Sequence, residues 1–240
     1  MIASAVIALV QPSCGLPSSS KNVPAGIVRA RKVPAGLSGR VTGLGATRVG
    51  SPPMASPEIE RWSGFKVWLF SLRNRTPKSN LAAVDRVVPR PGDRFLDLGC
   101  GLGAAVERAA SRGAEVSGVD PSPAMVEKAR ARVPTATFAV ASAEAIPFPD
   151  GAFTVVISVA TYHHWADPGA GLAEVHRVLA PGGRLLIVER KLRRRKGHGL
   201  HPDAARDVAM QLQALGFATT AVDHLRVGRK TYLAITTTPT

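Results

Sequence analysis

The chain has 240 residues, and its 31 basic residues outnumber its 17 acidic ones, which gives a formal net charge of +14 at pH 7. This length allows one α/β domain with an appended segment. The two cysteines, Cys14 and Cys100, lie far apart and in no metal-ligand spacing, so we expect neither a disulfide framework nor a metal site, and a reducing, cytoplasmic compartment fits best. No apolar run reaches the roughly 18 residues of a membrane-spanning helix. The positive charge suggests an anionic partner.

Residues 1–53 differ in composition from the rest of the chain. They contain six basic residues, no acidic residue and no aromatic residue, and glycine, proline and serine dominate. Such a segment cannot bury enough apolar surface to offset its conformational entropy, so we predict a disordered basic extension. A targeting segment and translated upstream sequence ahead of Met54 are both open interpretations. We therefore expect the folded domain to cover residues 54–240.

Two helices are predicted at the start of this domain, within residues 57–88. The first covers 57–73, where apolar side chains recur at helical spacing and two of the three tryptophans lie. The second covers about 79–88. The first helix can serve as a lid over an acceptor pocket or simply pack against the core, and the sequence leaves both alternatives open.

From residue 94 onward, strands and helices alternate. Strands are predicted over 94–98, 116–119, 137–141, 153–159, 184–188, 217–222 and 231–235, and helices over 103–112, 123–132, 167–180 and 201–215. The connection 223–230 is too short for a helical crossover, so the last two strands should pair antiparallel. This order predicts an α/β fold, a doubly wound, Rossmann-like seven-stranded sheet that is mostly parallel with a reversed strand at the C-terminus.

A glycine loop follows the strand 94–98. Gly99, Gly101 and Gly103 expose bare backbone at the start of a helix, where a ligand's polar atoms can approach. The spacing fits the S-adenosylmethionine loop, and read together with Ala104 it also fits a dinucleotide fingerprint. Asp120 ends the next strand and returns beside the loop, where its carboxylate can accept both hydroxyls of a ribose in either cofactor.

Two further segments separate these alternatives. Residues 141–153 and the turn at 179–185 resemble the corresponding segments of class I S-adenosylmethionine-dependent methyltransferases, of the small type related to ubiquinone and menaquinone C-methyltransferases. The chain also lacks the tyrosine–lysine pair of short-chain dehydrogenases, because Ala166 stands four residues after Tyr162. We therefore expect methyl transfer and disfavour hydride transfer.

The resemblance implies S-adenosylmethionine as the methyl donor and assigns the residues that bind it. The glycine loop would pack on the methionine part, and Asp97 would orient its amino group. Met125 would cover one face of the adenine, and Ser142 stands where this family usually has an aspartate that accepts from the adenine amino group. The implied cofactor site consists of Asp97, Gly99, Gly101, Gly103, Asp120, Met125, Ser142, Ala143 and Ser158.

The acceptor side is expected after the fourth strand, at the carboxyl end of the sheet. His163 and His164 lie there beside Tyr162 and Trp165, and a histidine can act as a base near neutral pH or merely shape the pocket. His176 and His198 have no such context and are expected at the surface. The basic run 190–196 can bind an anionic acceptor or RNA, or it can be a solvated loop.

We therefore expect a methyltransferase that acts on a small organic acceptor, for which the aromatic helix suggests an apolar molecule. Two alternatives stay open. One is an RNA methyltransferase that uses the basic run, and the other is a non-catalytic relative that keeps the fold and binds the cofactor or a partner.

Overall fold

The computed structural model describes residues 77–239 of the chain. The predicted extension 1–53 and the predicted helix 57–73 lie outside the described residues. Contacts divide the chain into the units Met1–Gly50 and Ser51–Thr240, and all described residues belong to the second unit.

Five α-helices and one short 3₁₀-helix are described. They are α2 (Lys78–Val87), α3 (Ala104–Ala110), α4 (Pro123–Arg132), the 3₁₀-helix η1 (Tyr162–His164), α5 (Pro168–Val178) and α6 (Pro202–Ala214). Proline occupies the first turn of α4, α5 and α6, where its missing N–H leaves no hydrogen bond unmade. In α5 the Asp167 side chain also caps the helix by accepting from Ala170 N. No described helix is long and apolar enough to cross a membrane.

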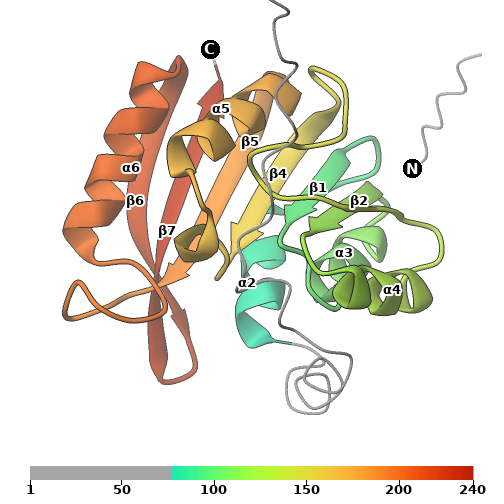
Figure 1. Ribbon diagram of the computed structural model, residues 1–240, viewed down its shortest axis with the longest axis horizontal. Coiled ribbons are helices and arrows are strands. Elements are labelled where there is room, and N and C mark those ends of the chain that lie inside the picture. Colours follow the sequence, from blue (N-terminus) through green and yellow to red (C-terminus); the bar gives the residue numbers. More distant parts are fainter. Residues whose placement is uncertain (1–76, 240) are drawn as a thin grey trace, which may run out of the picture. The chain divides into compact units, whose positions relative to one another are not determined.

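The seven strands form one sheet in the order β3-β2-β1-β4-β5-β7-β6 (Figure 1). They are β1 (Arg94–Leu98), β2 (Glu115–Asp120), β3 (Thr137–Val140), β4 (Phe153–Val159), β5 (Leu179–Arg190), β6 (Phe217–Val227) and β7 (Lys230–Pro239). The pairs among β1 to β5 are parallel, and β7 runs antiparallel to both β5 and β6. This arrangement confirms the predicted seven-stranded sheet with one reversed strand near the C-terminus.

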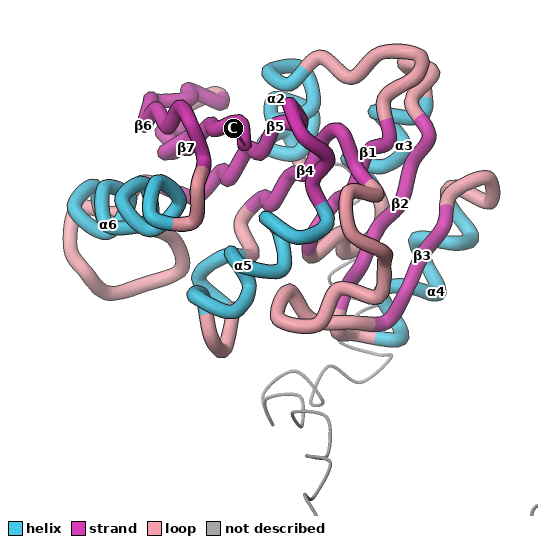
Figure 2. The backbone as a smooth tube through the Cα atoms, turned by 90° about the horizontal axis from the view of Figure 1, so that it is seen from above, coloured by secondary structure: helices cyan, strands magenta, loops and turns pink. Residues whose placement is uncertain are grey.

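Helices cover both faces of the sheet, as the view in Figure 2 shows. Apolar residues of α5 and α6 pack on one face, against Leu96, Ile187 and Leu233 among others. Apolar residues of α2, α3 and α4 pack on the other face, against Phe95, Ile157 and Val188 among others. Because both faces are covered, the central strands are buried almost throughout, which explains the near-continuous apolar runs in their sequences.

The predicted boundaries were wrong for the last three strands. β5 begins at Leu179, and a register shift against β4 accommodates the Pro-Gly-Gly turn instead of leaving it outside the strand. β6 and β7 are joined by a tight turn at Gly228, so the predicted connection 223–230 is mostly strand. Polar residues such as Asp223 and Arg226 made this stretch look like a loop, but β6 is the edge strand, where polar side chains can face water.

Candidate cofactor and acceptor site

The glycine loop connects β1 to α3. It is packed against neighbouring residues at Gly99, whereas no described atom covers it at Gly101. Gly99 and Cys100 both donate to Val119 O, at 2.8 and 2.9 Å, which fixes the loop to β2. Gly99 has φ +75°, and a Cβ added there would lie 2.4 Å from the Thr161 side chain. At Gly101, by contrast, no described atom lies within 4 Å of an added Cβ. A ligand would therefore approach the backbone at Gly101.

The third glycine has a different neighbour. A Cβ on Gly103 would lie 3.2 Å from the Cβ of Ala129, so this position faces α4. Gly103 therefore allows α3 and α4 to pack closely, and its backbone has φ +74°, which disfavours any side chain.

Asp120 ends β2 beside the loop, as its spacing predicts. Its Oδ2 accepts from Gly101 N and its Oδ1 from Ser122 N, both at 2.9 Å. Burial raises the pKa of this carboxyl, and the two backbone hydrogen bonds partly offset the rise. Each oxygen keeps a second acceptor site, so Asp120 can hold the loop and still accept from a ribose hydroxyl.

Asp97 lies on β1 next to this loop and is completely buried. Neither of its carboxylate oxygens has a hydrogen-bond partner among the described residues. Burial, and then the charge of Asp120, raise the pKa of Asp97 to about 7. A buried carboxylate without a partner is costly, and an ammonium group would relieve that cost. The residue thus fits the predicted contact with the amino group of S-adenosylmethionine.

The other predicted cofactor residues lie at the carboxyl ends of neighbouring strands. Met125 is buried early in α4, after β2, while Ser142 and the buried Ala143 follow β3. Ser158 lies near the end of β4, is fully buried, and its hydroxyl lies 2.8 Å from the hydroxyl of Thr161. Ser158 therefore positions its neighbour, while the first three lie where the resemblance expects the adenine.

The segment 141–153, expected beside the adenine, is anchored by two residues of α5 that the sequence analysis missed. Glu174 accepts from Ile146 N at 2.9 Å. Arg177 donates to Ile146 O and Phe148 O, at 2.9 and 2.8 Å, and also pairs with Glu174. These contacts lower the pKa of Glu174, with the Arg177 hydrogen bond as the largest cause. An acidic and a basic residue three positions apart on one helix is too common a pattern to reveal this role from sequence.

The histidine segment is joined directly to the glycine loop. Thr161, which precedes η1, donates its hydroxyl to Leu98 O at 3.0 Å, and its methyl group fills the space beside Gly99. The turn that follows carries His163 and His164. The structure thus brings the predicted acceptor-side residues next to the predicted cofactor loop.

His163 is oriented by a buried carboxylate. Its Nδ1 lies 2.9 Å from Oε2 of Glu189, whose side chain is completely buried near the end of β5. Its Nε2 is also buried and has no hydrogen-bond partner among the described residues. If Nδ1 carries the proton donated to Glu189, Nε2 keeps a free lone pair that can accept a proton.

Tyr162 is the alternative titratable group here, but burial and then the Glu189 charge raise its pKa to about 12. Its hydroxyl therefore stays protonated near neutral pH and cannot replace histidine as a base. Glu189 itself was missed in the sequence, although a carboxylate after the apolar run 185–188 was a usable signal.

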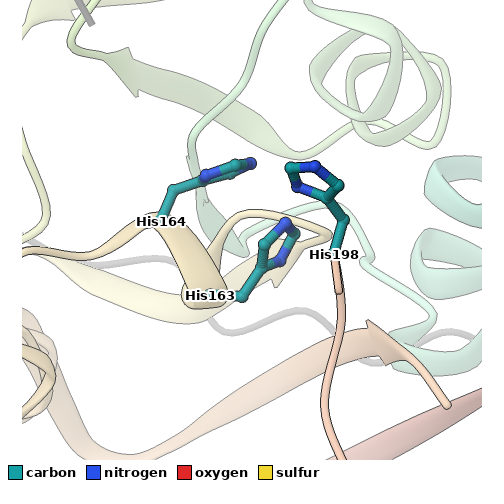
Figure 3. Close-up of side chains that lie close together, drawn as sticks. All are labelled: His163, His164 and His198. Carbon is teal, nitrogen blue, oxygen red and sulfur yellow. The ribbon is translucent and has the colours of Figure 1, made fainter. Parts of the chain in front are cut away.

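His198 is exposed, as expected, but it is not isolated. Its ring centroid lies 5.5 Å from that of His163 and 5.6 Å from that of His164. Figure 3 shows the three rings facing one another. The sequence predicts no such grouping, because His198 belongs to the separate loop between β5 and α6.

Comparisons with known proteins agree with this geometry. Residues 96–187 match a family model described as a methyltransferase domain. The chain is 42% identical over 106 residues to an uncharacterized methyltransferase of Mycobacterium bovis, a match that covers 44% of this chain and 43% of that protein. It is 42% identical over 113 residues to the demethylmenaquinone methyltransferase of Thermus thermophilus, covering 45% and 51% respectively. The chain thus spans about half the length of these relatives.

Solved structures show the same fold. A SAM-dependent methyltransferase from Aquifex aeolicus superposes with a TM-score of 0.56 at 21% identity, over 74% of this chain and 100% of that one. The sheet order, the glycine loop between two buried aspartates and the family match lead to one conclusion. Over residues 96–187 the chain is similar to class I S-adenosylmethionine-dependent methyltransferases, among them a demethylmenaquinone methyltransferase.

Proposed function

We propose that the protein transfers a methyl group from S-adenosylmethionine to a small organic acceptor. The observation that carries this proposal is the fully buried carboxylate of Asp97, which has no hydrogen-bond partner among the described residues and lies beside a glycine loop where no described atom covers Gly101. An apolar core gains nothing from such a group, whereas a ligand with an ammonium would pair with it.

When bound, S-adenosylmethionine supplies an electrophilic methyl group, so the protein needs to add only binding, orientation and proton removal. In the bound state Asp97 would accept from the ammonium and Asp120 from the ribose. Met125 and the backbone of Ala143 would lie against the adenine. Gly101 allows the methionine part to reach the loop backbone.

Replacing Asp120 with alanine is expected to weaken S-adenosylmethionine binding by about 1.5–3 kcal/mol, the scale of hydrogen bonds to a charged group. Titration calorimetry measures this. Asp120→Asn keeps one acceptor oxygen and should lose less. Asp207→Ala, which removes an exposed carboxylate on α6, is the matched control and should bind as the wild type does. An unchanged affinity in Asp120→Ala would show that the ribose contact is assigned to the wrong residue.

His163 is proposed as the base on the acceptor side. Its fixed orientation against Glu189 leaves Nε2 able to take a proton from the acceptor as the acceptor's lone pair attacks the methyl group in line. His164 is more exposed and would shape the pocket. This arrangement suits an acceptor that is neutral at working pH and must lose a proton.

The acceptor is proposed to be a small ring compound of the hydroquinone kind, whose ring hydroxyl can lose the proton that His163 takes. The relative from Thermus thermophilus is named for demethylmenaquinone, and the rings of Tyr162 and Trp165 lie 4.9 Å apart beside the histidines. Flat aromatic side chains suit a flat, apolar ring.

Transfer of a radiolabelled methyl group to the fractions of a cell lysate tests the acceptor class. We expect label in the fraction extracted into organic solvent, because quinone-type molecules partition there. Label in RNA would contradict the proposal and favour the basic segment 190–196 as a nucleic-acid contact. Binding of S-adenosylmethionine without label in any fraction would favour a non-catalytic relative.

A further inference from the structure

Three imidazole rings from two segments meet at the acceptor end of the sheet. His163 and His164 come from η1, and His198 comes from the loop between β5 and α6. One nitrogen of each ring lies within 4.8 Å of those of the other two. The rings of His163 and His164 are 4.0 Å apart between centroids, and in Figure 3 all three rings point toward a common space. Among the described residues, this is the one group of histidines, cysteines and carboxylates with such spacing.

His163 has the hydrogen-bond arrangement that is typical of a metal-binding histidine. Its Nδ1 is paired with the buried Glu189, which leaves Nε2 buried and without a partner in the described part of the chain. Metal-binding histidines commonly direct their second nitrogen to a carboxylate, which fixes the tautomer and makes the ligating nitrogen more basic. The Glu189–His163 pair reproduces that pattern.

The backbone fixes the position of His198 as well. The loop closes on itself through Leu192 N to Leu200 O and Leu200 N to Arg190 O, both 2.9 Å. Gly199, next to His198, has φ +142°, and a Cβ there would lie 2.3 Å from Arg190 O, so only glycine fits. The backbone beside His198 is therefore held against the end of β5 by the bond from Leu200 N to Arg190 O, even though the His198 ring is exposed.

We propose that His163, His164 and His198 form a binding site for one divalent transition-metal ion, of which Zn²⁺ is the typical example. Three neutral imidazoles are a common donor set for Zn²⁺, and they leave a fourth position for water or another oxygen donor. Tetrahedral Zn²⁺ needs ligand nitrogens about 3.3 Å apart, so the rings must close slightly. His198 is exposed and its ring can rotate toward the other two, while His163 stays fixed by Glu189.

The local charge opposes binding only weakly. The basic side chains of residues 193–196 are exposed, so water and salt screen them, whereas the Glu189 carboxylate is buried directly behind His163. The ion and the proposed base also exclude each other, since Nε2 of His163 cannot accept a proton while it binds a metal. The metal site does not depend on the proposed methyl transfer, because binding can be measured without the reaction.

The test is a titration of the full-length, untagged protein, stripped of metal with a chelator, with ZnCl₂ in a calorimeter. We expect one site per chain. His198→Ala should weaken binding at least about tenfold, and Glu189→Gln by about 10- to 100-fold, the usual cost of losing a carboxylate behind a ligand. His224→Ala removes an exposed histidine on β6 and should bind Zn²⁺ as the wild type does.

Titration with Co²⁺ identifies the ligands independently of stability. Visible absorption bands of low-symmetry, nitrogen-bound Co²⁺ should appear with the wild type and with His224→Ala and be lost with His198→Ala. Circular dichroism of each variant shows whether it is folded. The proposal is overturned if no saturable binding occurs, if folded His198→Ala binds Zn²⁺ as tightly as the wild type, or if the Co²⁺ spectrum shows thiolate charge transfer from Cys14 or Cys100.

Discussion

Replacing His163 with alanine is expected to lower kcat by about 100- to 10,000-fold, the range that a general base contributes. The reason is geometric: Nε2 of His163 is buried, lacks a partner in the described chain, and is aimed by the Nδ1 contact with Glu189. Cofactor affinity should stay nearly unchanged, because the contacts proposed for S-adenosylmethionine lie on the other side of Thr161. Single-turnover methyl transfer and cofactor titration measure the two quantities separately.

Glu189→Gln is the second variant for this prediction. Glutamine keeps the shape and can still contact the ring, but its amide can turn a donor toward Nδ1 and favour the wrong tautomer. We therefore expect a loss in kcat that is smaller than that of His163→Ala, again with unchanged cofactor affinity. His224→Ala serves as the control. If His163→Ala retained kcat, the histidine would only shape the pocket and the base would lie elsewhere.

Replacing Asp97 with asparagine is expected to stabilise the cofactor-free protein while weakening cofactor binding. Burial, and then the charge of Asp120, raise the pKa of Asp97 in the folded state from its ordinary value of 3.8 to about 7. Between these values the folded state binds the proton more tightly than the unfolded state, so this group lowers the free energy of unfolding as the pH rises. The loss begins near pH 4, is complete slightly above pH 7, and is on the order of 4 kcal/mol. Because asparagine cannot ionise, the variant does not lose this free energy of unfolding as the pH rises.

Urea unfolding across this pH range, without cofactor, measures the difference between the two proteins. The stability advantage of Asp97→Asn should grow from about pH 4 to pH 7 and then stay constant. Saturating S-adenosylmethionine should flatten the dependence in the wild type, since its ammonium pairs with the carboxylate. The variant should bind it more weakly by about 1.5–3 kcal/mol. Parallel pH profiles for both proteins would contradict the buried, unpartnered state of Asp97.

The parts that sequence predicted correctly are those set by short-range patterns. The apolar run 153–159 and the glycine loop each carry their signal within about ten residues, so the mostly parallel sheet and the place of the loop followed from the alternation of strands and helices. The position of Asp120 beside the loop was predicted for the same reason, because one helix and one strand return the chain to the same edge of the sheet, while its contact with a cofactor stays a prediction. The boundaries of β6 and β7 failed because an edge strand tolerates the same polar residues as a loop.

The contacts that the sequence could not predict are those between side chains that come from different strands and loops. Glu189 meets His163 because β4 and β5 are adjacent and parallel: Glu189 lies near the end of β5, and His163 follows the end of β4. His198 joins them only because its loop folds back along β5. The sequence around His198 gives no sign of this contact, because its composition is typical of a basic, solvated loop.

Thr161 connects the glycine loop of the cofactor side with the histidine segment of the acceptor side. Its methyl group fills the space beside Gly99, its hydroxyl donates to the end of β1, and two residues later the chain carries His163. Any shift of the loop on cofactor binding is therefore passed to the histidines through one side chain. By thermodynamic reciprocity, whatever factor the cofactor imposes on acceptor affinity, the acceptor imposes on cofactor affinity. Through Thr161, the binding of donor and acceptor would thus be coupled by the same factor in either order of addition.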